Sequence, residues 1–540
     1  MAGGRNQTPK ARGSATKTAK KLASEAKEPK ADMGSSSGLS ENEDGSTGGT
    51  LNGRSKIRGF FMTSEGARSL ALYEYHSAPL SAIDRVLNPY WTLAASVIPN
   101  WISPNMVTFL GLCAQFSAFV LGIVHDLGYL LQFVVSLTES IPLLQGADIT
   151  TISYCLDLFV FYYTMACFVF YHVADAADGK HARNTGQSTP LGALVDHGCD
   201  AWSVLCVFNC ALSAIFRKPN ALAVASVGGT AKTAAGLFNN DFNPRTHPLM
   251  PLTLMCYHFA VFASFFVAQW AHYHTGVLDT ANVTEGQIVY LLMLFLLSFA
   301  TLRHWSHYYT GYEVKEYNTE FMTWIIWASI VIPLYVTCNT MWIVKKAKRF
   351  RRTAGTFLIP YGIHMIQSLS FLRIPNFWQQ HFFKLIVLMS LTVVYMSLRA
   401  IVAQLCATKI PKVYAELLIP VSMPIAAYHL LLNKMVPQAL LQFLLGVPAL
   451  RKVLNNPVDL GDKLMWWCIL YTCSLSLFFM FDVIMTICRT LHIPFLAPLR
   501  KPWRKTNFEL ADRFTAAETE SAASRAGKAA SGPSSPKKNK

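Results

Sequence analysis

Four aspartates recur at helical spacing between residues 175 and 200. Asp175 and Asp178 are three positions apart, and Asp196 and Asp200 are four positions apart, so each pair lies on one face of a helix. The stretch 184–190 between the pairs contains a glycine and ends on a proline, which favours a short turn. The spacing therefore predicts two antiparallel helices that direct two carboxylates each toward a shared centre.

Small residues accompany the carboxylates on both predicted helix faces. Gly179 and Ala182 continue the face of the first aspartate pair, and Gly192 precedes the second pair by about one turn. Because these side chains are small, they leave room for a nucleotide to approach the backbone. Arg183 follows Ala182 and can pair with a phosphate.

Four carboxylates beside apolar sequence are costly unless a cation neutralises them. Hard divalent cations prefer oxygen ligands, and no cysteine or histidine pair with zinc spacing accompanies the aspartates. The residues therefore predict a site for Mg²⁺ or Mn²⁺ in which Asp175, Asp178, Asp196 and Asp200 hold two ions.

The elements that must position these aspartates are apolar. Of the 540 residues, 52% are hydrophobic and 14% are charged, whereas soluble proteins carry roughly 25% charged residues. A membrane-crossing helix needs about 20 mostly apolar residues, and about ten segments satisfy this. The expected fold class is therefore an all-α integral membrane protein with about ten transmembrane helices, or eleven if the apolar stretch 434–450 also crosses. The ten segments lie near 105–125, 151–174, 192–216, 250–271, 286–304, 319–344, 354–373, 380–405, 412–433 and 463–489.

The flanking segments are polar, and the formal net charge of +16 is concentrated in them. We interpret 1–65 and 491–540 as disordered basic tails. Attraction of the tails to anionic lipid headgroups is an alternative. Nucleic acid is not expected as a partner, because no aromatic residues interleave with the N-terminal basic ones. The stretch 217–249 is rich in Ala, Gly and Asn, and we interpret it as a loop or a surface helix.

A short amphipathic segment precedes the first apolar span. Ser81 and Asp84 have the spacing of a helix-start capping box, and apolar residues follow at roughly helical spacing up to Trp91. We interpret 66–103 as an N-terminal amphipathic segment that lies in the membrane interface. A short surface helix of the bundle is the alternative.

Basic clusters predict the orientation of the spans. With a cytosolic N-terminus, ten alternating spans return the basic clusters in 345–352 and 500–505 to the cytosol, as the positive-inside rule requires. The same topology places the segment from Asp178 to Arg183 at the cytosolic end of the second span.

The complete pattern D-x2-D-G-x2-A-R-x8-G-x3-D-x3-D, which runs from residue 175 to residue 200, resembles that of the CDP-alcohol phosphotransferase family at every defined position. Shorter matches are similar to the eukaryotic choline/ethanolamine phosphotransferases, and together they cover roughly residues 70–300. They are Pro89-Tyr90-Trp91, Pro104-Asn105, Asp196-His197-Gly198-Cys199-Asp200 and Thr284-Glu285. On this basis 104–304 is expected to hold the catalytic helices, and 305–490 further transmembrane helices.

The resemblance implies a reaction and its partners. It implies transfer of phosphocholine or phosphoethanolamine from CDP-choline or CDP-ethanolamine to diacylglycerol or its ether-linked analogue, with CMP as the other product. It also implies residence among membrane lipids of the endoplasmic reticulum or Golgi, an active site facing the cytosol, and a homodimer. Asn105 and Arg183 are assigned to the donor nucleotide by the same resemblance.

A base is needed to take the proton of the lipid hydroxyl. We favour His197, because imidazole accepts a proton near neutral pH and metal ligation lowers the basicity of Asp200, the other candidate. An alternative role for His197 is to orient a metal-bound aspartate. Glu285 is expected on the same side of the membrane, where it either orients His197 or meets the cationic headgroup of the donor. A charge at a helix N-terminus is the alternative for Glu285.

Two other functions compete with this interpretation. The alcohol is inositol or glycerol phosphate in smaller members of the superfamily, but these have about six spans rather than ten. A cation-binding transporter is the rival from another class, and transporters often contain internal repeats, which are not visible here.

Overall fold

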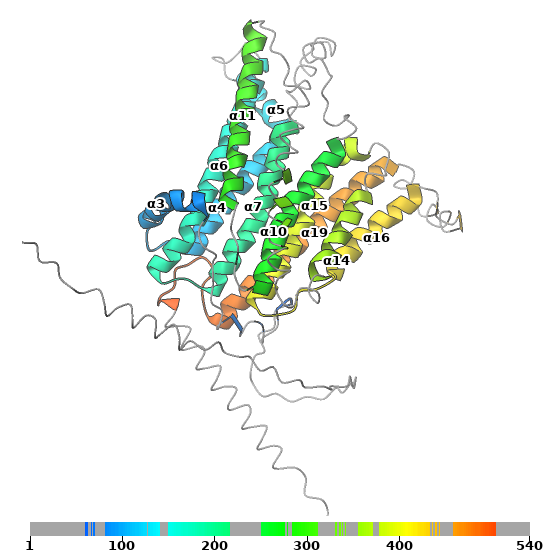
Figure 1. Ribbon diagram of the computed structural model, residues 1–540. Helices are drawn as coiled ribbons and strands as arrows, with labels where there is room; N and C mark the ends of the chain where they lie inside the picture. The colour runs from blue at the N-terminus through cyan, green and yellow to red at the C-terminus, as the bar shows by residue number, and fades with distance from the viewer. Residues whose placement is uncertain are drawn as a thin grey trace, which may run out of the picture. The chain divides into compact units, whose positions relative to one another are not determined.

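The structure is a computed structural model. The chain divides into two units, Met1–Ser55 and Lys56–Lys540, and every element described lies in the second. All elements in the described ranges are helices (Figure 1). The structure describes residues 60–62, 81–126, 128–140, 149–216, 250–275, 283–310, 355–370, 377–432 and 457–503, with scattered positions in 66–70, 278, 330–341 and 435–446.

The helices follow the expected apolar segments closely where both are described. The predicted segments 217–249, 319–344 and 434–450 lie outside the described residues or almost entirely so. One short helix, α5, was not expected. The helices are α3 (Ala82–Val97), α4 (Pro104–Asp126), α5 (Tyr129–Ser140), α6 (Ile149–Thr185), α7 (Pro190–Phe216), α10 (Met250–Thr275), α11 (Val283–Thr310), α14 (Gly355–Ser370), α15 (Phe377–Leu405), α16 (Ala415–Leu432) and α19 (Pro457–Leu491).

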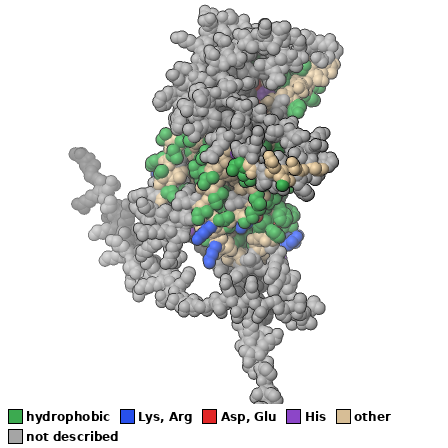
Figure 2. All heavy atoms as spheres, turned by 90° about the vertical axis from the view of Figure 1, so that its right-hand side faces the viewer, with side chains coloured by type: hydrophobic (Ala, Val, Ile, Leu, Met, Phe, Trp, Pro, Cys, Tyr) green, Lys and Arg blue, Asp and Glu red, His purple; other side chains and the backbone are tan. Residues whose placement is uncertain are grey.

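Several helices have the length and composition of membrane spans. Among the described residues, 5 helices are long and apolar enough to cross a membrane. Large apolar side chains such as Phe116, Phe170 and Phe478 remain exposed on them, as on a lipid-facing surface. Figure 2 shows such side chains covering much of the described part of one face, with lysine and arginine side chains near its lower edge. The protein is thus a multi-pass membrane protein, and the total of ten spans stays a prediction.

Helix α3 begins with the expected capping box. The Ser81 side chain accepts from the backbone N–H of Asp84, and the Asp84 side chain accepts from that of Ser81. Asp84 also accepts a hydrogen bond from Thr284 of α11, and Lys180 Nζ of α6 donates to Asn88 Oδ1 of α3 over 2.6 Å. Polar contacts therefore join α3 to α6 and α11, which leaves its position in the membrane interface as a prediction.

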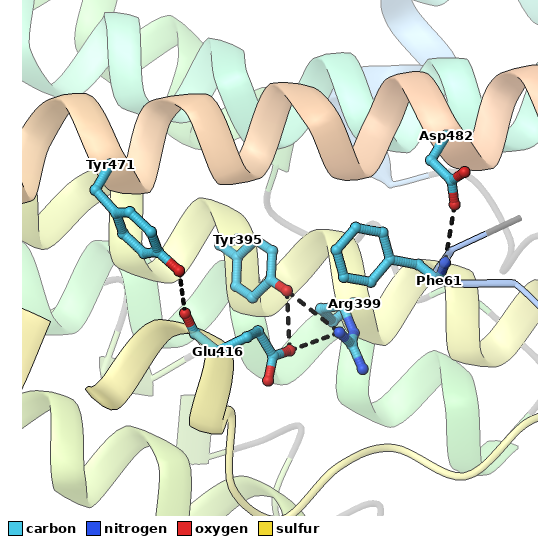
Figure 3. Close-up of polar contacts among 6 residues, drawn as sticks. All are labelled: Phe61, Tyr395, Arg399, Glu416, Tyr471 and Asp482. Carbon is cyan, nitrogen blue, oxygen red and sulfur yellow. Dashed lines mark hydrogen bonds and ion pairs between the residues drawn. The ribbon is translucent and has the colours of Figure 1, made fainter. Parts of the chain in front are cut away.

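Helix α15 lies at the centre of the C-terminal half and packs against α7, α10 and α19. Its apolar side chains, such as Leu398, are fully buried. Both charged residues of α15, Lys384 and Arg399, are paired with carboxylates. Arg399 forms an ion pair with Glu416 of α16 at 2.6 Å, and Tyr395 donates to the same carboxylate over 2.9 Å (Figure 3). Each charge is thereby neutralised within the bundle.

The first residues that the structure describes are held by α19. Asp482 accepts hydrogen bonds from the backbone N–H groups of Phe60 and Phe61, at 3.0 and 2.8 Å. The Phe61 ring lies 5.7 Å from the guanidinium carbon of Arg399, within reach of a cation–π interaction (Figure 3). This contact joins the first described residues of the chain to the last described helix.

Candidate active site

Helices α6 and α7 are antiparallel and are joined by the expected short turn. The backbone N–H of Gln187 donates to the Ala182 carbonyl over 2.8 Å, and Gly186 adopts a φ of 70°. These features form the Schellman motif that ends many helices, in which glycine occupies the left-handed position without strain. The Thr189 hydroxyl then accepts from the Gly192 N–H over 2.9 Å and caps the start of α7.

The turn brings the four aspartates together. Carboxylate oxygens of Asp175, Asp178 and Asp196 lie within 4.8 Å of one another. Asp196, His197 and Asp200 form a second group within the same limit. Asp196 belongs to both groups and is therefore the centre of the cluster.

The cluster has the properties of a site for divalent cations. Asp175 Oδ1 is buried and has no hydrogen-bond partner among the described residues. No lysine or arginine in the described ranges forms an ion pair with any of the four aspartates, so their like charges face one another unneutralised. Clustered carboxylate oxygens with uncompensated negative charge fit Mg²⁺ or Mn²⁺.

Two neutral side chains hold the carboxylates in place. The Thr108 hydroxyl on α4 donates to Asp178 Oδ2, and the Tyr171 hydroxyl on α6 donates to Asp200 Oδ1 over 2.7 Å. Sequence reasoning missed both residues. Tyr171 lies about one turn before Asp175 on the same helix, which is the only sequence signal that points to it.

His197 lies next to the carboxylates on α7. Its Nδ1 atom is 3.9 Å from Asp196 Oδ2 and 3.8 Å from Asp200 Oδ2. The side chain is 3% exposed, and its ring centroid lies 6.1 Å from that of His272 on α10. Gln404 of α15 contacts His272, and the distance between its Nε2 and His272 Nε2 is 3.3 Å. Residues from the C-terminal half therefore approach the site.

The small residues of the pattern lie close to other residues assigned to the donor, and their role there stays a prediction. A Cβ on Gly192 would meet Asn105 Oδ1 at 3.5 Å, so the starts of α4 and α7 are close neighbours. A Cβ on Gly179 would lie 3.5 Å from Arg183 Nη1. Ala182 is buried, whereas Arg183 is exposed at the end of α6.

Asn105 and Glu285 differ in how far the structure describes them. Asn105 Nδ2 donates to the backbone carbonyl of Phe495, beyond α19, over 2.8 Å. Glu285 lies in the first turn of α11, and its side chain lies outside the described residues. Its suggested contact with His197 therefore stays a prediction.

Comparison with protein families agrees with the geometry. Residues 101–310 match the family model of the CDP-alcohol phosphatidyltransferases. This range contains α4, α6, α7 and all four aspartates, and the match confirms the resemblance inferred from the aspartate pattern over this part of the chain.

Individual curated proteins show which members of the family this chain is similar to. Cholinephosphotransferase 1 of Saccharomyces cerevisiae is 31% identical over 235 residues, which are 43% of this chain and 46% of the relative. Cholinephosphotransferase 1 of Homo sapiens is 28% identical over 256 residues, 47% and 50% of the two chains. Choline/ethanolaminephosphotransferase 1 of Arabidopsis thaliana is 31% identical over 150 residues, 28% and 32% of the two chains. The chain thus spans about half the length, or less, of these curated relatives.

Proposed function

We propose that this protein transfers phosphocholine or phosphoethanolamine from the CDP-linked alcohol to the hydroxyl of diacylglycerol or its ether-linked analogue. The products are CMP and phosphatidylcholine or phosphatidylethanolamine. The observation that carries the proposal is the pair of ligand groups that share Asp196, with an unpartnered carboxylate oxygen at Asp175. The choice of choline and ethanolamine as the alcohols follows from the names of the relatives, cholinephosphotransferase and choline/ethanolaminephosphotransferase.

Asp175, Asp178, Asp196 and Asp200 are the residues that would hold Mg²⁺ or Mn²⁺, as two ions. Ions held there would supply positive charge that stabilises the negative charge developing on the donor phosphates and on departing CMP. Thr108 and Tyr171 keep Asp178 and Asp200 oriented through their hydrogen bonds. The protein thus supplies a preorganised anionic site before the donor arrives.

The reaction forms one bond to phosphorus, breaks another and transfers one proton, so a single base is enough. The lipid oxygen forms a bond to the phosphorus that carries the choline or ethanolamine, and the bond from that phosphorus to the CMP oxygen breaks, with the electron pair leaving on CMP. The hydroxyl proton moves to His197, whose Nδ1 lies 3.9 Å from Asp196 Oδ2 and 3.8 Å from Asp200 Oδ2. Asp200 is the alternative base. The other candidate role for His197 is that of a cation ligand, which is supported by its membership of the second group that could hold an ion.

The donor lies against the small residues at the end of the site. Gly179, Ala182 and Gly192 leave space for the nucleotide, Arg183 pairs with a phosphate, and Asn105 binds the nucleotide from α4. Glu285 meets the cationic headgroup or orients His197. An opening to the cytosol admits the water-soluble donor, while the lipid acceptor enters from the bilayer. An endoplasmic reticulum or Golgi membrane and a homodimer belong to the same proposal.

The test is an assay of CMP release in membranes that contain the protein. Labelled CDP-choline and CDP-ethanolamine are supplied separately with diacylglycerol, in the presence of Mg²⁺, Mn²⁺ or a chelator. We expect metal-dependent CMP release together with labelled phospholipid from at least one donor. Phospholipid formation without any metal requirement would refute the cation site. Absence of CMP release from both donors would refute the enzyme, and uptake of cations into sealed vesicles would favour the transporter instead.

A further inference from the structure

The segment that follows α19 is attached to the catalytic helices, although its contacts there are 312 to 393 residues away in sequence. We name residues 492–503 the C-terminal strap; unlike the disordered tail expected for 491–540, these residues pack against the catalytic helices. Its direction is set at the end of α19, where His492 has a φ of 54° and the Ile493 N–H donates to the Cys488 carbonyl over 3.2 Å. Both ends of the strap are buried, Ile493 at 5% exposure and Trp503 at 6%.

The first half of the strap is attached to the start of α4. The Ser103 hydroxyl donates to the Leu496 carbonyl over 2.7 Å, and Asn105 Nδ2 donates to the Phe495 carbonyl over 2.8 Å. The Phe495 ring also lies 6.4 Å from the ring of Phe109, one turn further along α4. The strap therefore accepts a hydrogen bond from the amide nitrogen of Asn105.

The second half of the strap is attached to the turn between α6 and α7. The Leu499 N–H donates to Gln187 Oε1 over 3.1 Å, and the Trp503 N–H donates to the Gly186 carbonyl over 2.8 Å. A small pocket between the strap and the catalytic helices is lined by Asn105, Gln187 and Thr189, together with Ile493 and Leu499 of the strap. The strap thus joins the start of α4 to the turn between α6 and α7, the two helices that carry the aspartates.

These contacts determine how Asn105 faces the site. With Nδ2 occupied by Phe495, the other amide atom, Oδ1, is the one nearest Gly192 on α7. One turn after Asn105, Thr108 donates to Asp178, so a shift of the start of α4 would also move a carboxylate partner. The strap lies beyond residues 101–310, the range that the family model matches.

We infer that the C-terminal strap is a positioning element of the donor site. It holds the amide of Asn105 and the turn at Gly186 and Gln187 in the arrangement that receives the nucleotide of a CDP-alcohol. The lipid acceptor does not depend on it. This inference rests on the proposed function, because it assigns the strap to one of the two substrates of that reaction.

A matched pair of strap variants isolates one of these hydrogen bonds. Leu499→Ala and Leu499→Pro both remove the leucine side chain, but only the proline removes the N–H that donates to Gln187. The full-length protein with each change is assayed for CMP release, with CDP-choline and diacylglycerol varied in turn. We expect Leu499→Pro to raise the KM for CDP-choline about fivefold over Leu499→Ala, the effect of one ordinary hydrogen bond. We expect kcat and the KM for diacylglycerol to agree within about twofold.

A change on the other side of the contact keeps the test valid if Leu499→Pro does not fold. Gln187→Met removes the acceptor at similar size and is expected to raise the donor KM by a similar factor. The double variant Leu499→Pro/Gln187→Met should then add little further, because both changes break the same bond.

Three outcomes would overturn the inference. Equal donor KM values in the matched pair and in Gln187→Met would show that the strap does not position the donor. A fall in kcat that follows only the amount of folded protein would show a purely structural role. A wild-type protein that releases no CMP from either donor would overturn the proposed function and this inference with it, and no variant is needed to recognise that case.

Discussion

The aspartate cluster of α6 and α7 and the ion pairs of the C-terminal helices treat charge in opposite ways. In the catalytic helices α4, α6 and α7, four carboxylates face one another with no lysine or arginine paired to them among the described residues. In the C-terminal helices α15, α16 and α19, two carboxylates form ion pairs with basic side chains. Glu416 pairs with Arg399, and Asp462 pairs with Lys384.

This difference separates charge that binds a ligand from charge that supports the fold. A neutralised pair needs nothing from outside the chain, and losing one partner leaves the other buried and unpaired. A cluster of like charges is unfavourable by itself and becomes favourable when a cation binds. Removing a charge should therefore lower activity in the catalytic helices and lower stability in the C-terminal helices.

The largest effect is expected from Asp196→Ala, because Asp196 belongs to both ligand groups. Loss of cation binding removes several kcal/mol of transition-state stabilisation, so CMP release should fall on the order of a thousandfold. Without metal, the melting temperature should stay the same or rise, because a repelling charge is gone. Asp462→Ala is the control from the C-terminal helices and should keep its activity per folded molecule. An Asp196→Ala protein with full Mg²⁺-dependent activity would remove the basis for the comparison.

His197→Ala tests the next largest effect. If His197 takes the proton, the variant should lose about hundredfold in kcat and keep its affinity for Mg²⁺. If instead the metal requirement rises sharply, His197 is a cation ligand. A nearly normal His197→Ala beside an inactive Asp200→Asn would move the base to Asp200.

The local part of this site could be predicted from the sequence. The spacing of the aspartates, the capping box at Ser81 and the turn near Gly186 all follow from short-range periodicity and turn chemistry, which neighbouring residues determine. The structure reproduces each of them. The helix α5 was not expected because its 12 residues are too few for a membrane span.

The long-range part of the site could not be predicted in this way. Thr108 reaches Asp178 only because α4 packs against α6, and Phe495 reaches Asn105 only because α19 ends beside α4. Nothing in the residue types at these positions signals contacts between residues 70 and 390 positions apart. Such contacts depend on how apolar helix faces pack, which a single sequence does not show.

Arg399→Met should destabilise the protein without affecting the chemistry. It leaves Glu416 without its cation while keeping much of the side-chain volume. The two side chains are 23% and 32% exposed, so we expect about 2–3 kcal/mol rather than the 3–5 of a fully buried pair. The double variant Arg399→Met/Glu416→Gln should recover most of the loss in a thermal unfolding experiment. A variant with normal stability but lost activity would show that charge in the C-terminal helices serves the reaction directly.

The smallest effect is expected where the two halves touch. Gly198 lies between His197 and Asp200, and a Cβ there would be 2.8 Å from Met480 Cε on α19. Alanine favours the helix by about 1 kcal/mol over glycine, and because Met480 Cε ends a flexible side chain the overpacking should cost about 1–2 kcal/mol, so Gly198→Ala should lose at most about 1 kcal/mol. Gly286→Ala is the matched control on α11, since no neighbouring atom lies within 4 Å of its Cβ position, and it should be neutral or slightly stabilised. Adding Met480→Ala should relieve the contact. If Gly198→Ala is as stable as the control and equally active, the position of α19 is not coupled to the carboxylates, and the two halves act independently.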